Sequence, residues 1–297
     1  MSLGRGPSDL GRPVPRGGDP PRVIGTAALR VLDQHDRAAA EELLARDPLV
    51  NVFVASRFRP GSGLGGELWG WTVDGRLDAL CYSGANLVPV DAGTEAIEAF
   101  ADRARRQGRR CSSIVGPTEM VEPLWRLLEP TWGPARAIRA RQPYMAIDAD
   151  PLVEPDPLVR RVRPEELDLL YPASVAMFTE EVGVSPVVGD SRAYRSRVAE
   201  LIDAGRAYAR IEDGRVVFKA EVGAVSRQAC QIQGVWVAPE QRGRGLSVPG
   251  TAAVVAAARR DHAPAVTLYV NDFNLAARRA YERVGFVELS TFTSVLF

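Results

Sequence analysis

The sequence is poor in the residues that build metal sites and disulfide frameworks. Of its 297 residues only two are histidine and three are cysteine, and Cys81, Cys111 and Cys230 lie far apart without a CxxC spacing. An odd number of distant cysteines does not predict a disulfide framework, and so few histidines argue against a zinc site. We therefore expect no structural metal and no metal cofactor.

The chain also lacks a long apolar run and an excess of charge of either sign. No segment approaches the roughly 20 apolar residues that span a bilayer. Thirty-seven basic residues balance 37 acidic ones, which gives no general electrostatic reason to bind nucleic acid or an anionic membrane. The N-terminal segment, residues 1–24, holds Gly, Pro and Arg but no apolar core of a signal peptide. We expect a disordered leader there, and a cytoplasmic protein that binds neither nucleic acid nor membrane.

What is present is the composition of an ordinary globular protein, with 46% apolar and 25% charged residues. A length of 297 residues fits two domains better than one. The segment around residues 149–157 is rich in Pro and Asp, as linkers often are. We therefore expect one α/β unit over residues 25–148, this linker, and a second unit over residues 158–297.

The first unit shows strand and helix patterns in alternation. Asp74-Gly75 is a favoured hairpin turn, and Thr94 is the expected N-cap of an amphipathic helix. The expected strands are residues 29–32, 67–72, 77–83, 112–115 and 136–147, and the expected helices are residues 36–45, 94–107 and 121–128.

The second unit repeats this order, with Asp213-Gly214 as its hairpin turn. The shared layout indicates a duplicated domain, and two unrelated α/β domains are the alternative. The expected strands are residues 159–163, 208–212, 216–225, 231–237 and 267–270 with a closing strand pair over 286–296, and the expected helices are residues 164–181, 191–204, 248–260 and 275–284.

The most informative segment is residues 234–248, GVWVAPEQRGRGLSV, which passes from an apolar strand through a turn into a helix. Gly243 and Gly245 carry no side chain, so a ligand can approach the backbone closely. The free amides and the positive dipole end of the following helix favour a phosphate. Arg242 and Arg244 add positive charge at the same place. This segment therefore predicts a phosphate-binding loop.

Three phosphate-binding motifs compete for this segment. A P-loop needs GxxxxGK[ST], but the segment has no lysine, and a dinucleotide fold needs GxGxxG, but Val248 stands where the third glycine belongs. The third motif, [QR]xxGx[GA], fits at Arg242 and Gly245 and departs at Ser247, a small residue that still permits a close approach. An ordinary glycine-rich turn is the plain structural alternative.

A second segment follows at residues 268–286, LYVNDFNLAARRAYERVGF. It has the form of a strand, an NxxN element at Asn271 and Asn274, a helix, and a YExxGF ending that begins at Tyr281. The two segments in this order resemble the GNAT superfamily of acyl-CoA-dependent N-acetyltransferases. The resemblance is specific over residues 205–290, and in the first unit it rests on layout alone.

The resemblance implies tandem GNAT-like domains, each a mixed and mostly antiparallel sheet flanked by helices. In the superfamily the fourth and fifth strands splay apart, and the pantetheine of the acyl-CoA lies between them and pairs with the fourth strand. The first unit lacks the loop and has Asp91 at the matching position. We expect a degenerate domain there that does not bind CoA and forms a wall of the acceptor site or a dimer surface; a homo-oligomer is compatible with the sequence.

The resemblance also implies which residues bind acetyl-CoA or another acyl-CoA. Backbone amides of the loop would wrap the pyrophosphate, and Asn271 and Asn274 would bond the pantetheine, with a helix N-cap as an equal role for Asn274. The expected set is Val235, Trp236, Val237, Arg242, Gly243, Arg244, Gly245, Leu246, Ser247, Val248, Asn271 and Asn274.

The implied reaction is direct transfer of acetyl from acetyl-CoA to a primary amine in a ternary complex. Tyr281 matches the family tyrosine near the CoA sulfur, whose phenol would protonate the leaving thiolate; a packed core tyrosine is the alternative. Many relatives carry a glutamate on the fourth strand, where this chain has Gln233. Glu221 on the preceding strand is therefore the candidate base, and an ion pair with Lys219 is its alternative role.

Two other functions remain as alternatives. A non-catalytic CoA-binding or regulatory module is favoured by Gln233 and disfavoured by Tyr281. An aminoacyl-tRNA-dependent transferase on a similar double fold has little use for a pyrophosphate loop, and the balanced charge gives no tRNA footprint. The sequence leaves the acceptor amine and the acyl length open.

Overall fold

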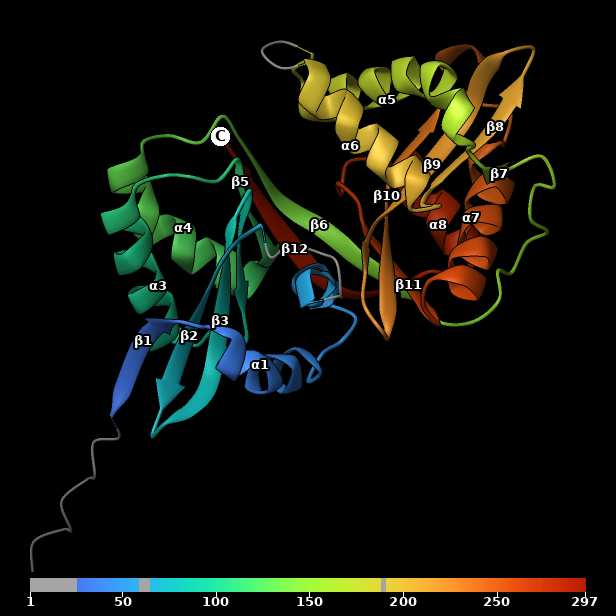
Figure 1. The fold of residues 1–297 in the computed structure, drawn as a ribbon. Coiled ribbons are helices and arrows are strands. Elements are labelled where there is room, and N and C mark those ends of the chain that lie inside the picture. The colour runs from blue at the N-terminus through green and yellow to red at the C-terminus, as the bar shows by residue number, and fades with distance from the viewer. Residues whose placement is uncertain (1–25, 59–64, 188–190) are drawn as a thin grey trace, which may run out of the picture.

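The computed structural model describes residues 26–58, 65–187 and 191–297, so the leader expected over residues 1–24 lies outside them. One mixed sheet of 12 strands runs through the molecule in the order β1-β2-β3-β4-β5-β12-β6-β11-β10-β9-β8-β7. Helices flank both faces of this sheet, which confirms the mixed α/β fold (Figure 1). Within the described ranges, no helix has the length and apolar character needed to cross a membrane.

The first half of the chain begins with a strand and a helix and then forms the predicted hairpin. Asp74 and Gly75 both have positive φ, as the two central residues of a type I′ turn require. The elements are β1 (Ala27–Val31), α1 (Arg37–Leu44), α2 (Val52–Ala55), β2 (Gly66–Val73), β3 (Arg76–Gly84), β4 (Asn86–Val90), α3 (Thr94–Gln107), β5 (Ser113–Pro117), α4 (Thr118–Trp132) and β6 (Ala137–Ile147).

The second half repeats this plan, with Asp213 and Gly214 at positive φ in its hairpin turn. Residues 149–157, the expected linker, contain no helix or strand. The elements are β7 (Arg160–Arg161), α5 (Leu167–Val182), α6 (Ser191–Asp203), β8 (Ala207–Glu212), β9 (Arg215–Val225), β10 (Ala229–Val237), α7 (Ser247–Asp261), β11 (Ala265–Tyr269), α8 (Leu275–Val284) and β12 (Val287–Leu296).

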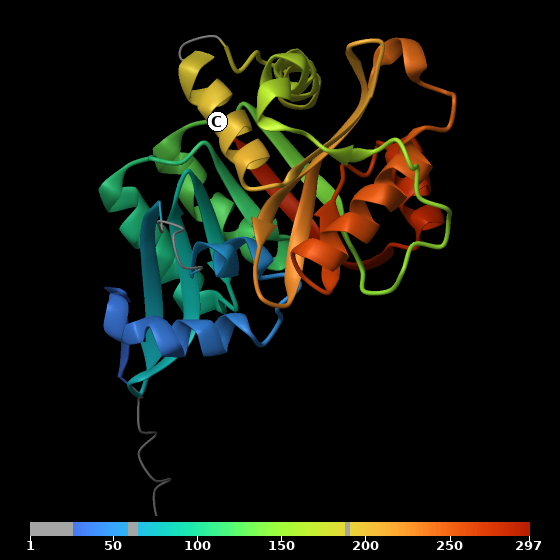
Figure 2. The ribbon, with the colours of Figure 1, turned by 45° about the vertical axis from the view of Figure 1, so that its right-hand side comes forward.

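Each half places its last strand beside the fifth strand of the other half. β6 pairs antiparallel with β11, and β12 pairs antiparallel with β5. β6 and β12 also pair with each other at the centre of the sheet, so three adjacent hydrogen-bonded ladders join the halves (Figures 1 and 2). The order β1 to β5 followed by β12 matches the order β7 to β11 followed by β6, which supports a duplicated fold. The division into two domains at the linker of residues 149–157 stays a prediction, and the sheet is continuous across the two halves.

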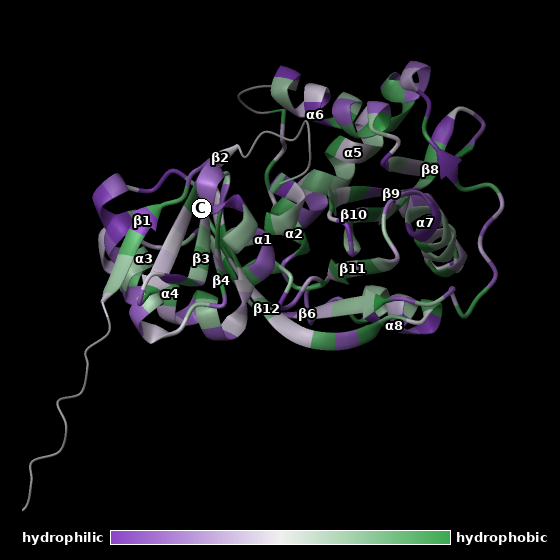
Figure 3. Cartoon of the chain, turned by 60° about the horizontal axis from the view of Figure 1, so that its bottom comes forward, coloured by the Kyte–Doolittle hydropathy of each residue, from purple (hydrophilic) through white to green (hydrophobic). Residues whose placement is uncertain are grey.

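Separate apolar clusters hold the helices on the two faces of the sheet. In the second half, α7 and α8 pack on one face, and α5 and α6 pack against the other. Helix α2 of the first half places Val52 among Ala224, Ala229 and Ala265 of β9, β10 and β11. Figure 3 shows α2 between the halves, beside β10 and β11. The first half therefore covers part of the second half's sheet, on the face opposite α7 and α8.

Three local predictions differ from the structure. Gly93, in extended backbone, is the N-cap of α3, so Thr94 is the first helical residue and not the cap. The closing segment is the single strand β12 and not a strand pair, because it continues without a turn between β5 and β6 and pairs with both. β4 and the short α2 were not predicted; β4 contains Pro89, a residue type that weakens a strand pattern.

Candidate functional site

The strands β10 and β11 separate at the point where the superfamily resemblance places the acyl-CoA. They run parallel and pair only where Ala229–Gln231 lie opposite Ala265–Thr267. Both strands continue beyond this stretch, β10 to Val237 and β11 to Tyr269. An opening between the two strands therefore begins after Gln231, and we call it the strand opening.

A bulge at Gly234 accompanies the strand opening. Gly234 has φ of +61°, and a Cβ there would lie 2.9 Å from Met177 Cε and 3.3 Å from Lys219 Nζ, so only glycine fits without displacement. Beyond the bulge, Ala238 N donates to a carbonyl of β9. Because amides alternate along a strand, the Val237 amide points the other way, into the strand opening.

The predicted phosphate loop lies at the end of β10 and leads into α7. Arg242, Gly243, Arg244 and Gly245 are exposed, and α7 begins at Ser247. Gly243 and Gly245 have φ of +75° and +80°, and a Cβ on either would meet no atom within 4 Å. The backbone conformation thus favours glycine here, and the space around both is open to a ligand.

Glu180 in the last turn of α5 connects this loop with β10. Arg242 Nη2 donates to Glu180 Oε2 at 2.7 Å, and Trp236 Nε1 donates to Glu180 Oε1 at 3.3 Å. Arg242 Nε also donates to the Val237 carbonyl at 3.0 Å. These contacts hold the guanidinium beside the loop. Glu180 was not predicted, because nothing in the sequence pattern of α5 distinguishes it from a solvent-facing glutamate.

Glu221 lies in a buried polar cluster on the α5 side of the sheet. Lys219 Nζ donates to Glu221 Oε2 at 3.1 Å, and Gln233 Nε2 donates to Glu221 Oε1 at 2.8 Å. Burial acts to raise the pKa of Glu221, but the Lys219 ammonium, the two hydrogen bonds and Arg197 together hold it below its ordinary value. Glu221 is therefore ionised at neutral pH. The ion pair with Lys219 is present, and the role as a base stays a prediction.

Tyr281 lies on the other side of the sheet, on the face of α8 that packs into the core. Its side chain is buried, and its ring contacts Phe286 edge-on. Burial, followed by the Glu181 carboxylate, raises the pKa of Tyr281 well above its ordinary value. The phenol therefore keeps its proton at neutral pH, as a proton donor must. The packed role is observed, and the acid role stays a prediction, for which the raised pKa makes the phenol a weaker acid.

The two asparagines after β11 organise the start of α8. Asn274 is the N-cap, and its Oδ1 accepts from Ala277 N at 3.2 Å. Asn271 Oδ1 accepts from Gln142 Nε2 of β6 at 3.1 Å, and Gln142 Oε1 accepts from the Ser294 hydroxyl at 2.6 Å. Asn271 thus links the end of β11 to β6 and β12, which we call the exchanged strands because each pairs with the fifth strand of the other half. A bond from either amide to pantetheine stays a prediction.

The first half differs from the second at the matching position. Residues 91–93 lead directly from β4 into α3, so the strand and the helix are joined by a short turn in place of an exposed loop. Asp91 has φ of +49° in this turn, and its carboxylate pairs with Arg46. The turn has neither the length nor the glycines of the loop in the second half.

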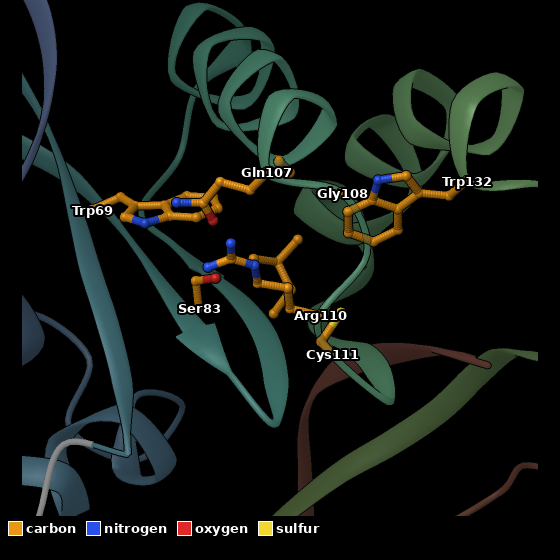
Figure 4. Close-up of a pocket in the computed structure, with 9 residues that line it drawn as sticks. Trp69, Ser83, Gln107, Gly108, Arg110, Cys111 and Trp132 are labelled. Atoms are coloured by element: carbon orange, nitrogen blue, oxygen red, sulfur yellow. The ribbon is translucent and has the colours of Figure 1, made fainter.

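A small pocket in the first half lies apart from the strand opening (Figure 4). Burial raises the pKa of Cys111 to about 11, so its thiol is protonated at neutral pH and is a poor nucleophile. No residue that the sequence singled out as catalytic or cofactor-binding lines this pocket. Its lining is Trp69, Ser83, Leu87, Ala104, Gln107, Gly108, Arg110, Cys111 and Trp132.

Family comparisons separate the two halves. Residues 177–286 match the acetyltransferase (GNAT) family, and residues 66–170 match a domain of unknown function (DUF4081). A comparison with curated proteins finds no match. The GNAT match contains the strand opening, the loop, Glu221 and Tyr281.

Solved structures share the fold at low sequence identity. A tandem GNAT protein from the clavulanic acid biosynthesis pathway is 15% identical, with a TM-score of 0.54 over 91% of this chain and 98% of that chain. A GCN5-related N-acetyltransferase from Sphaerobacter thermophilus is 17% identical, with a TM-score of 0.57 over 90% and 94%. A GNAT-family acetyltransferase from Colwellia psychrerythraea is 11% identical, with a TM-score of 0.54 over 91% and 99%. The likeness covers both halves and supports the tandem GNAT-like fold.

Proposed function

We propose that this chain, whose residues 177–286 form a domain of the acetyltransferase (GNAT) family, transfers an acetyl group from acetyl-CoA to a primary amine. The strand opening carries the proposal, because it leads from the buried Glu221 cluster to the exposed loop at the start of α7. An acyl-CoA along β10 would pair with backbone groups of Val235–Val237 and reach the loop amides with its pyrophosphate.

The cofactor-binding set that the sequence indicated is retained in this proposal. Arg242 and Arg244 flank the two open glycines, and the amides of Leu246, Ser247 and Val248 begin the helix. Asn271 and Asn274 shape the adjacent turn before α8. The partners are therefore an acyl-CoA and an amine acceptor, and the chemistry needs no metal ion.

In the proposed reaction an uncharged amine attacks the thioester carbonyl. The C–N bond forms, a backbone amide of β10 stabilises the oxyanion, and the C–S bond then breaks. Glu221 takes the proton that the ammonium must lose and passes it to solvent, and Tyr281 protonates the departing thiolate. The surplus proton on the new amide nitrogen returns to the Tyr281 phenolate, so the products are the amide, CoA thiol and one proton.

A CoA-binding module without activity is the alternative function. Such a module would need only the loop and the strand opening. The ionised Glu221 in the buried cluster favours the enzyme, because acyl transfer from an ammonium needs a proton acceptor, whereas CoA binding alone does not.

The first test is the melting temperature with acetyl-CoA, CoA and NAD. A ligand at about 100 times its Kd adds about 2.7 kcal/mol, which raises the melting temperature by about 5–10 °C for a protein of this size. We expect this rise with both CoA species, no rise with NAD, and its loss in Gly245→Glu. Gly214→Glu is the matched control, because Gly214 has φ of +71° and open space in a distant hairpin. No rise with either CoA species would refute the proposal.

Turnover separates the enzyme from the binding module. We expect Tyr281→Phe to lower acetyl transfer by about 10²–10⁴-fold, because general acid catalysis contributes about that much. The rise in melting temperature with CoA should persist in this variant. Full activity in Tyr281→Phe would remove the proton donor from the mechanism.

A further inference from the structure

The last turn of α5 crosses the strand opening. On one side Glu180 binds Trp236 and Arg242, which belong to β10 and the phosphate loop. On the other side, two arginines bind backbone carbonyls of the same turn. Arg136, just before β6, donates from Nη1 to the Val182 carbonyl at 2.7 Å, and Arg139 of β6 donates to the Glu181 carbonyl. Because β11 lies between β6 and β10 in the sheet, this turn bridges the space where the two strands part.

Glu181 is the loosely paired carboxylate of this turn. Its side chain is half exposed, and its Oε1 lies 3.6 Å from Arg139 Nη1, which is longer than a hydrogen bond. The neighbouring acids are paired more closely, Glu180 with Arg242 and Glu221 with Lys219. The Glu181 carboxylate therefore keeps hydrogen-bonding capacity for another cation.

Tyr269 places the end of β11 beside this turn. Tyr269 is the last residue of β11, and its side chain lies on the α5 side of the sheet, because its neighbours Leu268 and Val270 pack into the core on the opposite face. The last turn of α5 contacts β10 through Glu180 and β6 through Arg139, and β11 lies between these two strands. The turn that carries Glu181 therefore passes over the end of β11.

The ring of Tyr269 gives this place a fixed aromatic wall. Tyr269 is 36% exposed and stacks on Phe292 with ring centroids 5.7 Å apart. Phe292 in turn stacks on Tyr144 at 4.3 Å, and the Tyr144 hydroxyl donates to the Leu49 carbonyl of the first half at 2.6 Å. The buried members of this stack hold the exposed ring in place.

We propose that Glu181 and the exposed ring of Tyr269 form the acceptor subsite, which binds the ammonium group of a cationic primary amine beside the thioester. This inference rests on the proposed function. A carboxylate makes strong charge-assisted hydrogen bonds to an ammonium group, and an aromatic face attracts the same cation. The first half takes part through Arg139 and Tyr144, so it forms a wall of the acceptor site.

Steady-state kinetics with charged and uncharged acceptors test the subsite. The probes are 1,4-diaminobutane and tyramine, which are cationic at neutral pH, and hydroxylamine, which is uncharged. We expect Glu181→Gln to raise KM for the two cationic amines about tenfold, the loss of one charge-assisted contact, with kcat changed by less than about threefold. The enzymatic turnover of hydroxylamine, after subtraction of its uncatalysed reaction with acetyl-CoA, should be unchanged, and Glu181→Asp should recover part of the affinity. The matched control, Glu180→Gln, should raise KM for acetyl-CoA instead.

The outcomes separate the subsite from the acyltransferase proposal. An unchanged KM in Glu181→Gln, or an equal loss with hydroxylamine, would overturn the subsite, the second because it indicates a structural defect. If acetyl-CoA raises the melting temperature but neither cationic amine is acetylated, the cationic subsite is also wrong while acyl-CoA binding stands. If acetyl-CoA does not raise the melting temperature, the proposed function itself is refuted.

Discussion

At the residue scale, Lys219, the single lysine of the chain, is buried in an ion pair. It is 1% exposed, and its ammonium donates to Glu221 at 3.1 Å. Removing two charges from water costs several kcal/mol for each ion, and their mutual attraction and hydrogen bonds offset that cost only while both are present. The pair is therefore more sensitive to the loss of one partner than to the loss of both.

We predict that Lys219→Met lowers the free energy of unfolding by about 3–5 kcal/mol, because it leaves Glu221 buried without its cation. The double variant Lys219→Met/Glu221→Gln should recover most of this loss. Urea unfolding followed by circular dichroism measures both. Additive losses in the double variant would show that the two charges do not stabilise each other.

The lowered pKa of Glu221 also sets the sign of a pH effect. Because its pKa is lower in the folded state than in the unfolded state, its ionisation stabilises the fold above the unfolded-state pKa, and this contribution is lost as pH falls through the folded-state pKa. Glu221→Gln should therefore destabilise most near neutral pH and progressively less below about pH 4. Melting temperatures of the variant and the parent across this range provide the measurement. A gap that widens in acid would contradict the assigned shift.

At the element scale, the bulge in β10 decides where the strand opening begins. Gly234 has φ of +61° and leaves no room for a Cβ beside Met177, Lys219 and Glu221. Pairing of β10 with β9 is interrupted between Gln233 and Trp236 and then resumes. The bulge therefore lets β10 turn away from β11 while it stays paired with β9.

We predict that Gly234→Ala destabilises the protein by about 1–3 kcal/mol, because a strained backbone and a blocked side chain act together. It should also lower acetyl transfer more than Gly214→Ala, whose position has a similar φ of +71° but open space. Thermal unfolding and turnover of both variants test this. Equal effects at the two positions would mean that backbone conformation alone matters at Gly234.

At the scale of the whole molecule, the exchanged strands make each half incomplete without the other. A fragment of residues 1–148 lacks β12, and a fragment of residues 149–297 lacks β6. In each fragment a strand that is paired on both sides in the full chain becomes a free edge, which favours aggregation. The first half thus supplies β6, which the sheet of the second half needs as the neighbour of β11.

We predict that each fragment expressed alone aggregates and that the two co-expressed fragments form a stable 1:1 complex. Size-exclusion chromatography and the melting temperature with acetyl-CoA measure this, with the full chain as the reference. A monomeric fragment 149–297 that binds acetyl-CoA unaided would show that the exchanged strands are not required for the second half to fold.

Much of this molecule was determined by its sequence, because the features concerned depend on neighbouring residues. Asp-Gly pairs produced both hairpin turns, since these residues tolerate positive φ. Helix α8 has the predicted bounds, Leu275–Val284, with Asn274 as its cap. Gly243 and Gly245, singled out by the glycine pattern, have positive φ and open space around them, while their contact with a phosphate stays a prediction.

Only the tertiary structure decided the features that depend on distant contacts. An alternating apolar pattern shows that a segment is a strand but not which strand it pairs with, so the exchange of β6 and β12 was not predicted. Gly250 was missed, although a Cβ there would lie 2.8 Å from the Phe218 ring, because that closeness arises only when α7 packs on β9. Glu180 and Glu181 look like ordinary helix glutamates, and they gain their positions at the strand opening from β10 on one side and from β6, a strand of the other half, on the other.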